Sequence, residues 1–258
     1  MVYMGSKAAL VSELGPILKS HLVSDSQWYI ECFMGGGNMI SMIDHPLRWG
    51  NDYNDLLPAM FSYLQSKVYF DERTCEWCFP EDTFPTEVSK EEYIYMRGHK
   101  EEFPKWLVAY VGFCCSFKAT FFQGYAGKMY QDRNRASIFK QFTAHYHNGM
   151  RGVKLTAGDY RDMDIPRGSL LYLDPPYANT SAYKSSAGSI NKFDHPAFYR
   201  WCVSQVKDNE CSVFLSEYTK PDYGTWDTVW QQIKFNNMYS GGGPKPFNVE
   251  KLFRCIGE

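Results

Sequence analysis

An acid, two prolines and a tyrosine follow a short apolar run in the segment SLLYLDPPY, residues 169 to 177. The run Ser169 to Leu173 is too short for a typical helix, and its aliphatic and aromatic residues favour a strand buried on both faces. The two prolines cannot continue a strand or a helix. We therefore expect Asp174 and Tyr177 at the carboxyl end of a central strand, where open α/β sheets bind their ligands.

These four residues suit the binding of an exocyclic amino group on a flat base. The carboxylate of Asp174 and a backbone carbonyl held outward by Pro175 and Pro176 offer two acceptors to one amine, which has two N–H donors. The ring of Tyr177 can stack on the base. Such a site orients the amine lone pair toward an electrophilic methyl group, a reaction that depends on positioning and electrostatics. The alternative is a strand end with a rigid turn.

A second candidate site is the glycine triplet in YIECFMGGGNMI, at an expected strand-to-helix junction. Glycine at 35 to 37 permits positive φ and lets N–H groups at a helix N-terminus approach a ligand. The segment departs from G-x-G-x-x-G because residue 40 is isoleucine, which disfavours a dinucleotide oxidoreductase. Asp52 ends the next expected strand, where an acid binds ribose hydroxyls. Together these features predict a nucleoside cofactor, although glycine triplets also occur in ordinary turns.

Strand and helix patterns alternate around both sites, which predicts a parallel α/β sheet. We expect helices over residues 6–22, from residue 39, from residue 54 and over 195–207. We expect strands over residues 28–33, 47–52, 153–160, 169–173 and 211–218, and a closing antiparallel pair over 228–235 and 248–256. Residues 68–150 interrupt this order with prolines and clustered aromatics, and only 103–115 and 135–146 are clearly helical there. The pattern predicts one domain from 1–67 and 151–258, with 68–150 inserted into it.

Composition is that of an ordinary globular protein, with 44% hydrophobic and 22% charged residues in 258. No apolar run approaches the roughly 18 residues that a membrane span needs, and the first residues lack a signal-peptide core. We expect a cytoplasmic protein with no membrane partner.

Cys75 and Cys78 form a C-x-x-C pair that could close a zinc site with Cys114, Cys115 and His99. No second such pair accompanies it, so we expect no metal.

Positive charge is concentrated in one part of a chain whose net charge is −2. Residues 118–154 contain seven Lys or Arg and a single acid, Asp132. Such asymmetry is typical of a surface that binds phosphates, although a solvated loop can show it by chance.

Several stretches together resemble the D12 class of DNA adenine-N6 methyltransferases. They are YMGSK (3–7), ECFMGGGN (31–38), NDYN (51–54), GDY (158–160) and DPPY (174–177). The resemblance implies contacts with S-adenosylmethionine from Tyr3, Lys7, Phe33, Gly35, Gly37, Asp52, Asp159 and Asp174. It implies a catalytic tetrad of Asp174, Pro175, Pro176 and Tyr177. The chain departs from the family at Cys32, which is usually proline, and at Tyr160, which is usually phenylalanine.

The resemblance also implies a Rossmann-like sheet with an antiparallel closing strand, and a DNA target-recognition role for residues 68–150. The target adenine would be rotated out of the duplex while the insertion holds phosphates and reads base edges. Candidate DNA contacts are Lys118, Lys128, Arg133, Asn134 and Arg135.

The sequence therefore predicts a site-specific DNA adenine-N6 methyltransferase that acts on double-stranded DNA, from a bacterium or a phage, with no obligatory protein partner. The alternatives are an amino-methyltransferase for cytosine-N4 in DNA or adenine in RNA, and a catalytically silent DNA-binding protein on the same scaffold.

Overall fold

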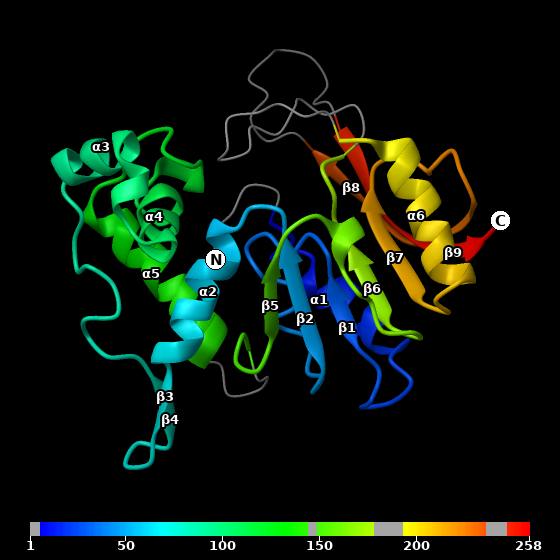
Figure 1. The fold of residues 1–258 in the computed structure, drawn as a ribbon, viewed down its shortest axis with the longest axis horizontal. Coiled ribbons are helices and arrows are strands. Elements are labelled where there is room, and N and C mark those ends of the chain that lie inside the picture. Colours follow the sequence, from blue (N-terminus) through cyan, green and yellow to red (C-terminus); the bar gives the residue numbers. More distant parts are fainter. Residues whose placement is uncertain (1–5, 144–148, 178–192, 236–246) are drawn as a thin grey trace.

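A seven-stranded sheet forms the centre of the chain (Figure 1), in a computed structural model that describes residues 6–143, 149–177, 193–235 and 247–258. The strand order is β5-β2-β1-β6-β7-β9-β8. Strand β9 runs antiparallel to both of its neighbours, and the pairs from β5 to β7 are parallel. The strands are β1 (Tyr29–Glu31), β2 (Arg48–Asp52), β5 (Lys154–Ala157), β6 (Leu170–Leu173), β7 (Ser212–Glu217), β8 (Thr225–Phe235) and β9 (Phe247–Gly257). The expected α/β fold with an antiparallel closing strand is confirmed.

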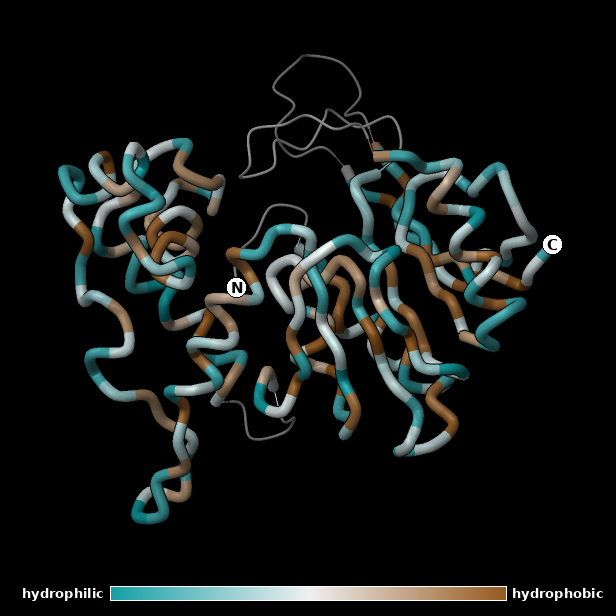
Figure 2. The backbone as a smooth tube through the Cα atoms, in the orientation of Figure 1, coloured by the Kyte–Doolittle hydropathy of each residue, from teal (hydrophilic) through white to brown (hydrophobic). Residues whose placement is uncertain are grey.

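Alternate residues of the central strands pack into two hydrophobic cores, one on each face of the sheet. In β6, Leu170 and Tyr172 belong to one core, and Leu171 and Leu173 to the other, because side chains alternate along a strand. Helices α1 (Val11–Lys19) and α2 (Leu56–Lys67) contribute to the first core, and α6 (His195–Lys207) to the second. The strands carry the apolar stretches that Figure 2 shows in brown.

The inserted segment packs at the β5 edge of the sheet, beside α2 (Figure 1). It begins with a hairpin of β3 (Tyr69–Asp71) and β4 (Glu76–Cys78). The helices of the insertion that follow are α3 (Lys90–Gly98), η1 (Lys100–Glu102), α4 (Lys105–Ala109), the π-helix η2 (Tyr110–Cys114), η3 (Phe117–Ala119) and α5 (Lys128–Thr143). A further short helix, η4 (Tyr160–Asp162), lies outside the insertion and follows β5. Tyr63 of α2 stacks on Trp106 of α4 with ring centroids 3.8 Å apart. The insertion therefore shares its core with one face of the sheet.

The helix expected over 103–115 is α4 followed by the π-helix η2, and the helix expected over 135–146 is α5, which begins already at Lys128. Outside the insertion, two expected helices differ in the structure. The helix expected over 6–22 is limited to Val11–Lys19, with Pro16 inside it. The helix expected from residue 39 is replaced by turns. Arg48 of β2 donates to the carbonyl of Ile40 at 3.0 Å, so a side chain from the sheet contacts the backbone where the helix was expected. Among the described residues, no helix is long and apolar enough to cross a membrane.

Candidate active site

Four parallel strands bring the predicted site residues to one edge of the sheet. Strands β5, β2, β1 and β6 are neighbours in the same orientation, so their carboxyl ends lie together. Asp52 is the last residue of β2, and Asp174 follows β6 directly. Asp159 comes two residues after β5. Segments that are far apart in sequence therefore meet at this edge.

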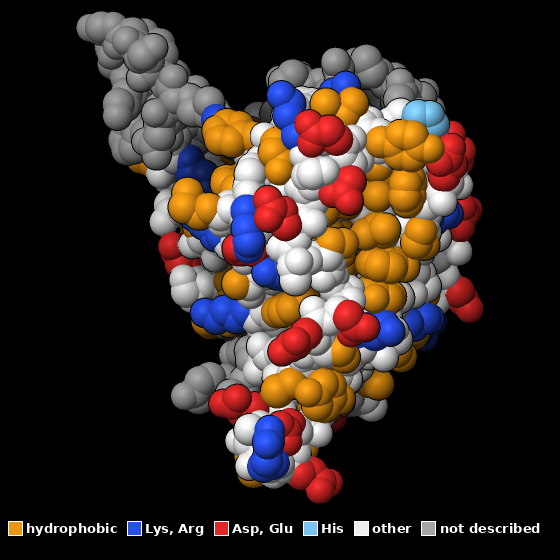
Figure 3. Space-filling view, turned by 90° about the vertical axis from the view of Figure 1, so that its left-hand side faces the viewer, with side chains coloured by type: hydrophobic (Ala, Val, Ile, Leu, Met, Phe, Trp, Pro, Cys, Tyr) orange, Lys and Arg blue, Asp and Glu red, His pale blue; other side chains and the backbone are white. Residues whose placement is uncertain are grey.

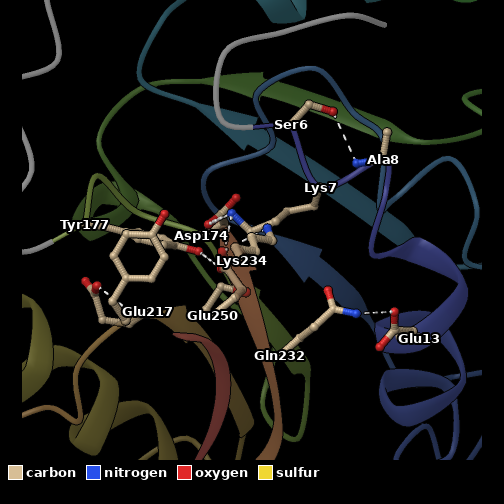
Figure 4. Close-up of polar contacts among 12 residues, drawn as sticks. Ser6, Lys7, Ala8, Glu13, Asp174, Tyr177, Glu217, Gln232, Lys234 and Glu250 are labelled. Atoms are coloured by element: carbon tan, nitrogen blue, oxygen red, sulfur yellow. Dashed lines mark hydrogen bonds and ion pairs between the residues drawn. The ribbon is translucent and has the colours of Figure 1, made fainter. Parts of the chain in front are cut away.

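Asp174 is paired with a lysine from the amino-terminal segment. Lys7 Nζ donates to Asp174 Oδ1 at 2.7 Å, and both side chains are largely buried (Figure 4). Burial alone lowers the pKa of Lys7, but Asp174 and Glu250 outweigh it, so the pKa is raised above its ordinary value. Burial also raises the pKa of Asp174, and Lys7 opposes that rise. The lysine therefore favours the carboxylate form of Asp174.

The tyrosine of the tetrad is held in place from several sides. Lys7 Nζ lies 4.8 Å from the ring centroid of Tyr177, within the range of a cation–π interaction. Tyr218 packs edge-on against the same ring, with centroids 4.6 Å apart. Burial raises the pKa of Tyr177 far above its ordinary value, so its hydroxyl stays protonated and donates a hydrogen bond to Glu250 Oε1.

Glu250 is a site residue that the sequence analysis missed. It lies on β9 with 2% of its surface exposed, and its carboxylate also accepts from Lys234 of β8 at 3.0 Å. Lys7 Nζ is 3.7 Å from Glu250 Oε1. Residues two apart share a face of a strand, so Glu250 occupies the side of β9 on which Leu252 is buried. An acid on the core side of an otherwise alternating strand is a signal for such a residue.

The tetrad loop is also attached to helix α6. His195, the first residue of this helix, donates from Nε2 to the carbonyl oxygen of Pro176 at 2.8 Å. Asp194 caps the helix by accepting from the N–H of Ala197, which satisfies one of the unpaired donors at its start. The conformation of the two prolines is thereby fixed relative to α6 on one side and, through Tyr177, to β9 on the other.

The glycine turn and Asp52 form one hydrogen-bonded unit. Asp52 Oδ2 accepts from the N–H of Gly35 at 2.7 Å, and Oδ1 accepts from the N–H of Asn54 at 2.8 Å. Gly35 and Gly37 have φ values of 51° and 65°, which favour glycine. Burial raises the pKa of Asp52 to about 6, although both N–H groups lower it. Each carboxylate oxygen keeps a second lone pair for a ligand, and the side chain is half-buried.

Asp159 adjoins this unit, because the N–H of Gly158 donates to the carbonyl of Asp52 at 3.1 Å. The Asp159 carboxylate is paired with Arg161 at 2.6 Å. The hydrogen bond from Arg161 lowers the pKa of Asp159. Asp159 is therefore a carboxylate over the pH range in which Asp52 titrates.

Phe33 lies half-buried at the start of the glycine turn. Its ring packs in an aromatic cluster, with centroids 5.4 Å from Tyr160, 5.8 Å from Phe193 and 5.5 Å from Phe198. This cluster joins the turn to α6. Tyr3, the other aromatic residue expected near the cofactor, lies outside the described residues.

Comparison with known proteins decides which family this site represents. The profile of the family D12 class N6 adenine-specific DNA methyltransferase matches residues 3–251, nearly the whole chain. The chain belongs to this family. Membership in the D12 class confirms the resemblance, and the D12 enzymes use S-adenosylmethionine as methyl donor and DNA as substrate.

Other comparisons add little to the D12 assignment. SMU.472, a candidate methyltransferase complexed with SAH, matches 98% of this chain with 12% identity and a TM-score of 0.36. The match covers 54% of SMU.472, so this chain spans about half the length of that protein. No curated protein sequence matches the chain.

The basic residues expected to contact DNA in this D12 protein have different environments. Lys118, Lys128 and Arg133 are exposed. Arg135 is half-buried and donates to the carbonyls of Pro85 and Thr86. On the outer face of the insertion, Lys and Arg side chains alternate with Asp and Glu (Figure 3), so this face is not uniformly basic.

Asn134 does not have the environment that a base-reading residue needs, and this expectation was wrong. Only 2% of its surface is exposed, and its Nδ2 donates to the carbonyl of Cys114 at 2.7 Å. The buried face of α5 contains Gln131, Asn134 and Gln141 in addition to apolar residues. These amides hold the helix against its neighbours instead of facing a ligand.

The C-x-x-C pair is part of the β3–β4 hairpin, where Cys75 is exposed and Cys78 is half-buried. Cys114 and Cys115 are buried in the core around η2. Within the described parts of the chain, no group of three or more His, Cys, Asp or Glu side chains could hold a metal ion.

Proposed function

We propose that this protein transfers the methyl group of S-adenosylmethionine to the N6 amine of an adenine that has been rotated out of duplex DNA, at specific sites. The observation that carries the proposal is the convergence of Asp174, Tyr177 and Lys7 at the same sheet edge as Asp52. We assign residues 1–67 and 151–258 to cofactor binding and catalysis, and 68–150 to target recognition.

The glycine turn and Asp52 fit the methyl donor. The open lone pairs of the half-buried Asp52 carboxylate suit ribose hydroxyls, and the turn at Gly35 and Gly37 brings backbone close to the ligand. Tyr3, Lys7, Phe33, Asp159 and Asp174 complete the proposed cofactor surroundings. When bound, S-adenosylmethionine supplies an electrophilic methyl group.

The tetrad residues orient the amine that is methylated. Asp174 and the carbonyl of Pro175 accept the two N–H bonds of the adenine amine, so its lone pair points toward the methyl group. Lys7 favours the anionic form of Asp174, and Tyr177 stacks on the base. The amine nitrogen forms the new N–C bond as the bond between the methyl carbon and the cofactor sulfur breaks, which leaves S-adenosylhomocysteine, and the methylated amine releases one proton to solvent.

Exposed cations of the insertion provide the contacts to the DNA backbone. A base must leave the helical stack before its amine can reach a buried site, and the flanking phosphates must be held meanwhile. Lys118, Lys128 and Arg133 have the exposure that this role requires.

The test is transfer of tritiated methyl groups from S-adenosylmethionine to unmethylated duplex DNA, followed by nucleoside analysis of the digest. We expect label in N6-methyladenine, and loss of that label in Asp174→Ala. Label in cytosine, RNA or protein would change the substrate. A chain that binds cofactor and DNA but transfers no label would be a reader on this scaffold.

A further inference from the structure

Three side chains of the site point toward one buried carboxylate (Figure 4). Glu250 Oε1 accepts from the Tyr177 hydroxyl and lies 3.7 Å from Lys7 Nζ, while Oε2 accepts from Lys234 Nζ at 3.0 Å. Glu250 is 2% exposed. A buried carboxylate is costly unless its oxygens are paired, and the donors around Glu250 belong to the active site and to β8.

The partners of Glu250 are the two side chains that surround Asp174. Lys7 contacts Asp174 directly, and Tyr177 is the last residue of the tetrad. Glu250 comes from the carboxyl-terminal strand pair, which is remote in sequence from all of them. Removing its charge would take the second carboxylate away from Lys7, and would weaken the hydrogen bond that anchors the Tyr177 hydroxyl.

We propose that Glu250 is a positioning residue for methyl transfer, which acts by fixing the Tyr177 ring and the Lys7 ammonium in the places where the target base and Asp174 need them. The proposal deepens the function proposed above and rests on it. Glu250 is not placed in contact with substrate. Lys234 belongs to the same group of interacting side chains. Its ammonium balances the negative charge of Glu250, which Lys7 and Tyr177 also contact.

Glu250→Gln is the decisive variant, because it keeps the size of the side chain and an acceptor oxygen while it removes the charge. Since a misplacement of about 1 Å costs up to about 100-fold in rate, we expect kcat to fall about 10- to 100-fold. The dissociation constant of S-adenosylhomocysteine should change less than kcat does, because the hydrogen bonds of the Asp52 carboxylate go to Gly35 and Asn54 and do not involve Glu250. Steady-state methylation and equilibrium binding measure these two quantities, and single-turnover methylation shows whether the loss lies in the chemical step.

Glu13→Gln provides a matched control. Glu13 also holds β8, by accepting from Gln232 Nε2 (Figure 4) and from Trp230 Nε1 at 3.0 Å each, but these contacts are exposed. We expect Glu13→Gln to leave kcat near the wild-type value. Equal losses in both variants would show that Glu250 only stabilises the strand pair.

A double-mutant cycle with Tyr177→Phe separates positioning from stability. If Glu250 acts through the Tyr177 hydroxyl, the loss caused by Glu250→Gln should be at least about threefold smaller in the Tyr177→Phe background. Independent effects would overturn the inference. If Glu250→Gln does not fold, Glu250→Asp keeps the charge but shortens the reach, and we expect the same loss of kcat and the same coupling.

The two proposals fail in different ways. An active wild-type enzyme with an equally active Glu250→Gln variant would overturn the positioning role alone. A folded wild-type protein that binds S-adenosylhomocysteine but methylates no DNA would overturn the proposed function, and the positioning role with it.

Discussion

Asp174 is flanked by charges of both signs. Lys7 Nζ lies 2.7 Å from Asp174 Oδ1 and 3.7 Å from Glu250 Oε1. Burial and Glu250 raise the pKa of Asp174, whereas Lys7 lowers it. The ionised form that can accept two N–H bonds therefore depends on one cation.

Replacing Lys7 by Met should move the acidic limb of the pH–rate profile to higher pH. The ammonium lowers the pKa of Asp174, so its loss raises that pKa, and more of the carboxyl is protonated at a given pH. We expect kcat/KM for DNA to begin its decline at a higher pH than in the wild type, whereas Lys19→Met, on the exposed side of α1, keeps the wild-type profile. An unshifted limb in Lys7→Met would contradict the assigned role.

Cofactor affinity should fall as the pH falls through about 6. Burial raises the pKa of Asp52 from 3.8 to about 6, and only the carboxylate accepts from both ribose hydroxyls and backbone N–H groups. If binding requires the ionised form, the dissociation constant rises about tenfold per pH unit below that pKa. Calorimetric titration with S-adenosylhomocysteine from pH 5 to 8 measures it.

Titration of Asp52 should also change the stability of the cofactor-free protein, but here stability falls as the pH rises, whereas cofactor affinity rises with pH. A carboxyl whose folded pKa lies above its ordinary value contributes stability that is complete below pH 3.8 and is lost as the pH rises through about 6. Asp52→Asn should remove the pH dependence of cofactor binding and the contribution of residue 52 to the pH dependence of stability. A binding constant that keeps its pH dependence in Asp52→Asn would assign the titration to another group.

At the scale of elements, the sequence was sufficient where local chemistry decides the structure. The strand that ends at Asp174 is apolar throughout and stops at prolines, so β6 and the tetrad were predictable. The turn at Gly35–Gly37 was predictable for the same reason, since glycine marks positive φ.

Elements that depend on distant contacts were not predictable. The residues from 39 have helical periodicity but form turns, and there Arg48, a residue of the sheet, contacts the carbonyl of Ile40. Asn134 is buried because α5 packs its amide-bearing face inward. Glu250 meets Tyr177 only because β9 lies beside β7. Periodicity does not report these tertiary partners.

Gly37→Ala should destabilise the glycine turn and weaken cofactor binding. Gly37 has a φ of 65°, and a Cβ there would lie 3.2 Å from Met150 Sδ. The left-handed conformation costs a non-glycine residue about 1–2 kcal/mol. Urea unfolding should show a loss of that size, together with weaker S-adenosylhomocysteine binding.

Gly98 is the control for this substitution. It ends α3, and a Cβ there would meet nothing within 4 Å. Since alanine is favoured over glycine in helices by up to about 1 kcal/mol, Gly98→Ala should leave stability unchanged or slightly raised. A Gly37→Ala variant as stable as Gly98→Ala would show that the turn tolerates a side chain.

For the whole molecule, the insertion and the sheet form one body. The first hydrophobic core joins Leu14 of α1 and Phe61 of α2 to Tyr110 and Phe142 of the insertion. A DNA contact on the insertion is thus held at a fixed distance from the carboxyl edge of the sheet, which is what a site-specific reaction requires.

Arg133→Ala should weaken DNA binding and reduce its dependence on salt. Arg133 is exposed on α5, within the basic part of the chain, and each phosphate contact releases about one counterion. We expect the slope of log K against log salt to change by about 1.

Arg73 provides the control. It is 89% exposed in the β3–β4 turn, which lies at the end of the insertion opposite the carboxyl edge of the sheet (Figure 1), so Arg73→Ala should leave the slope unchanged. Equal slopes for both variants would place the DNA on another surface.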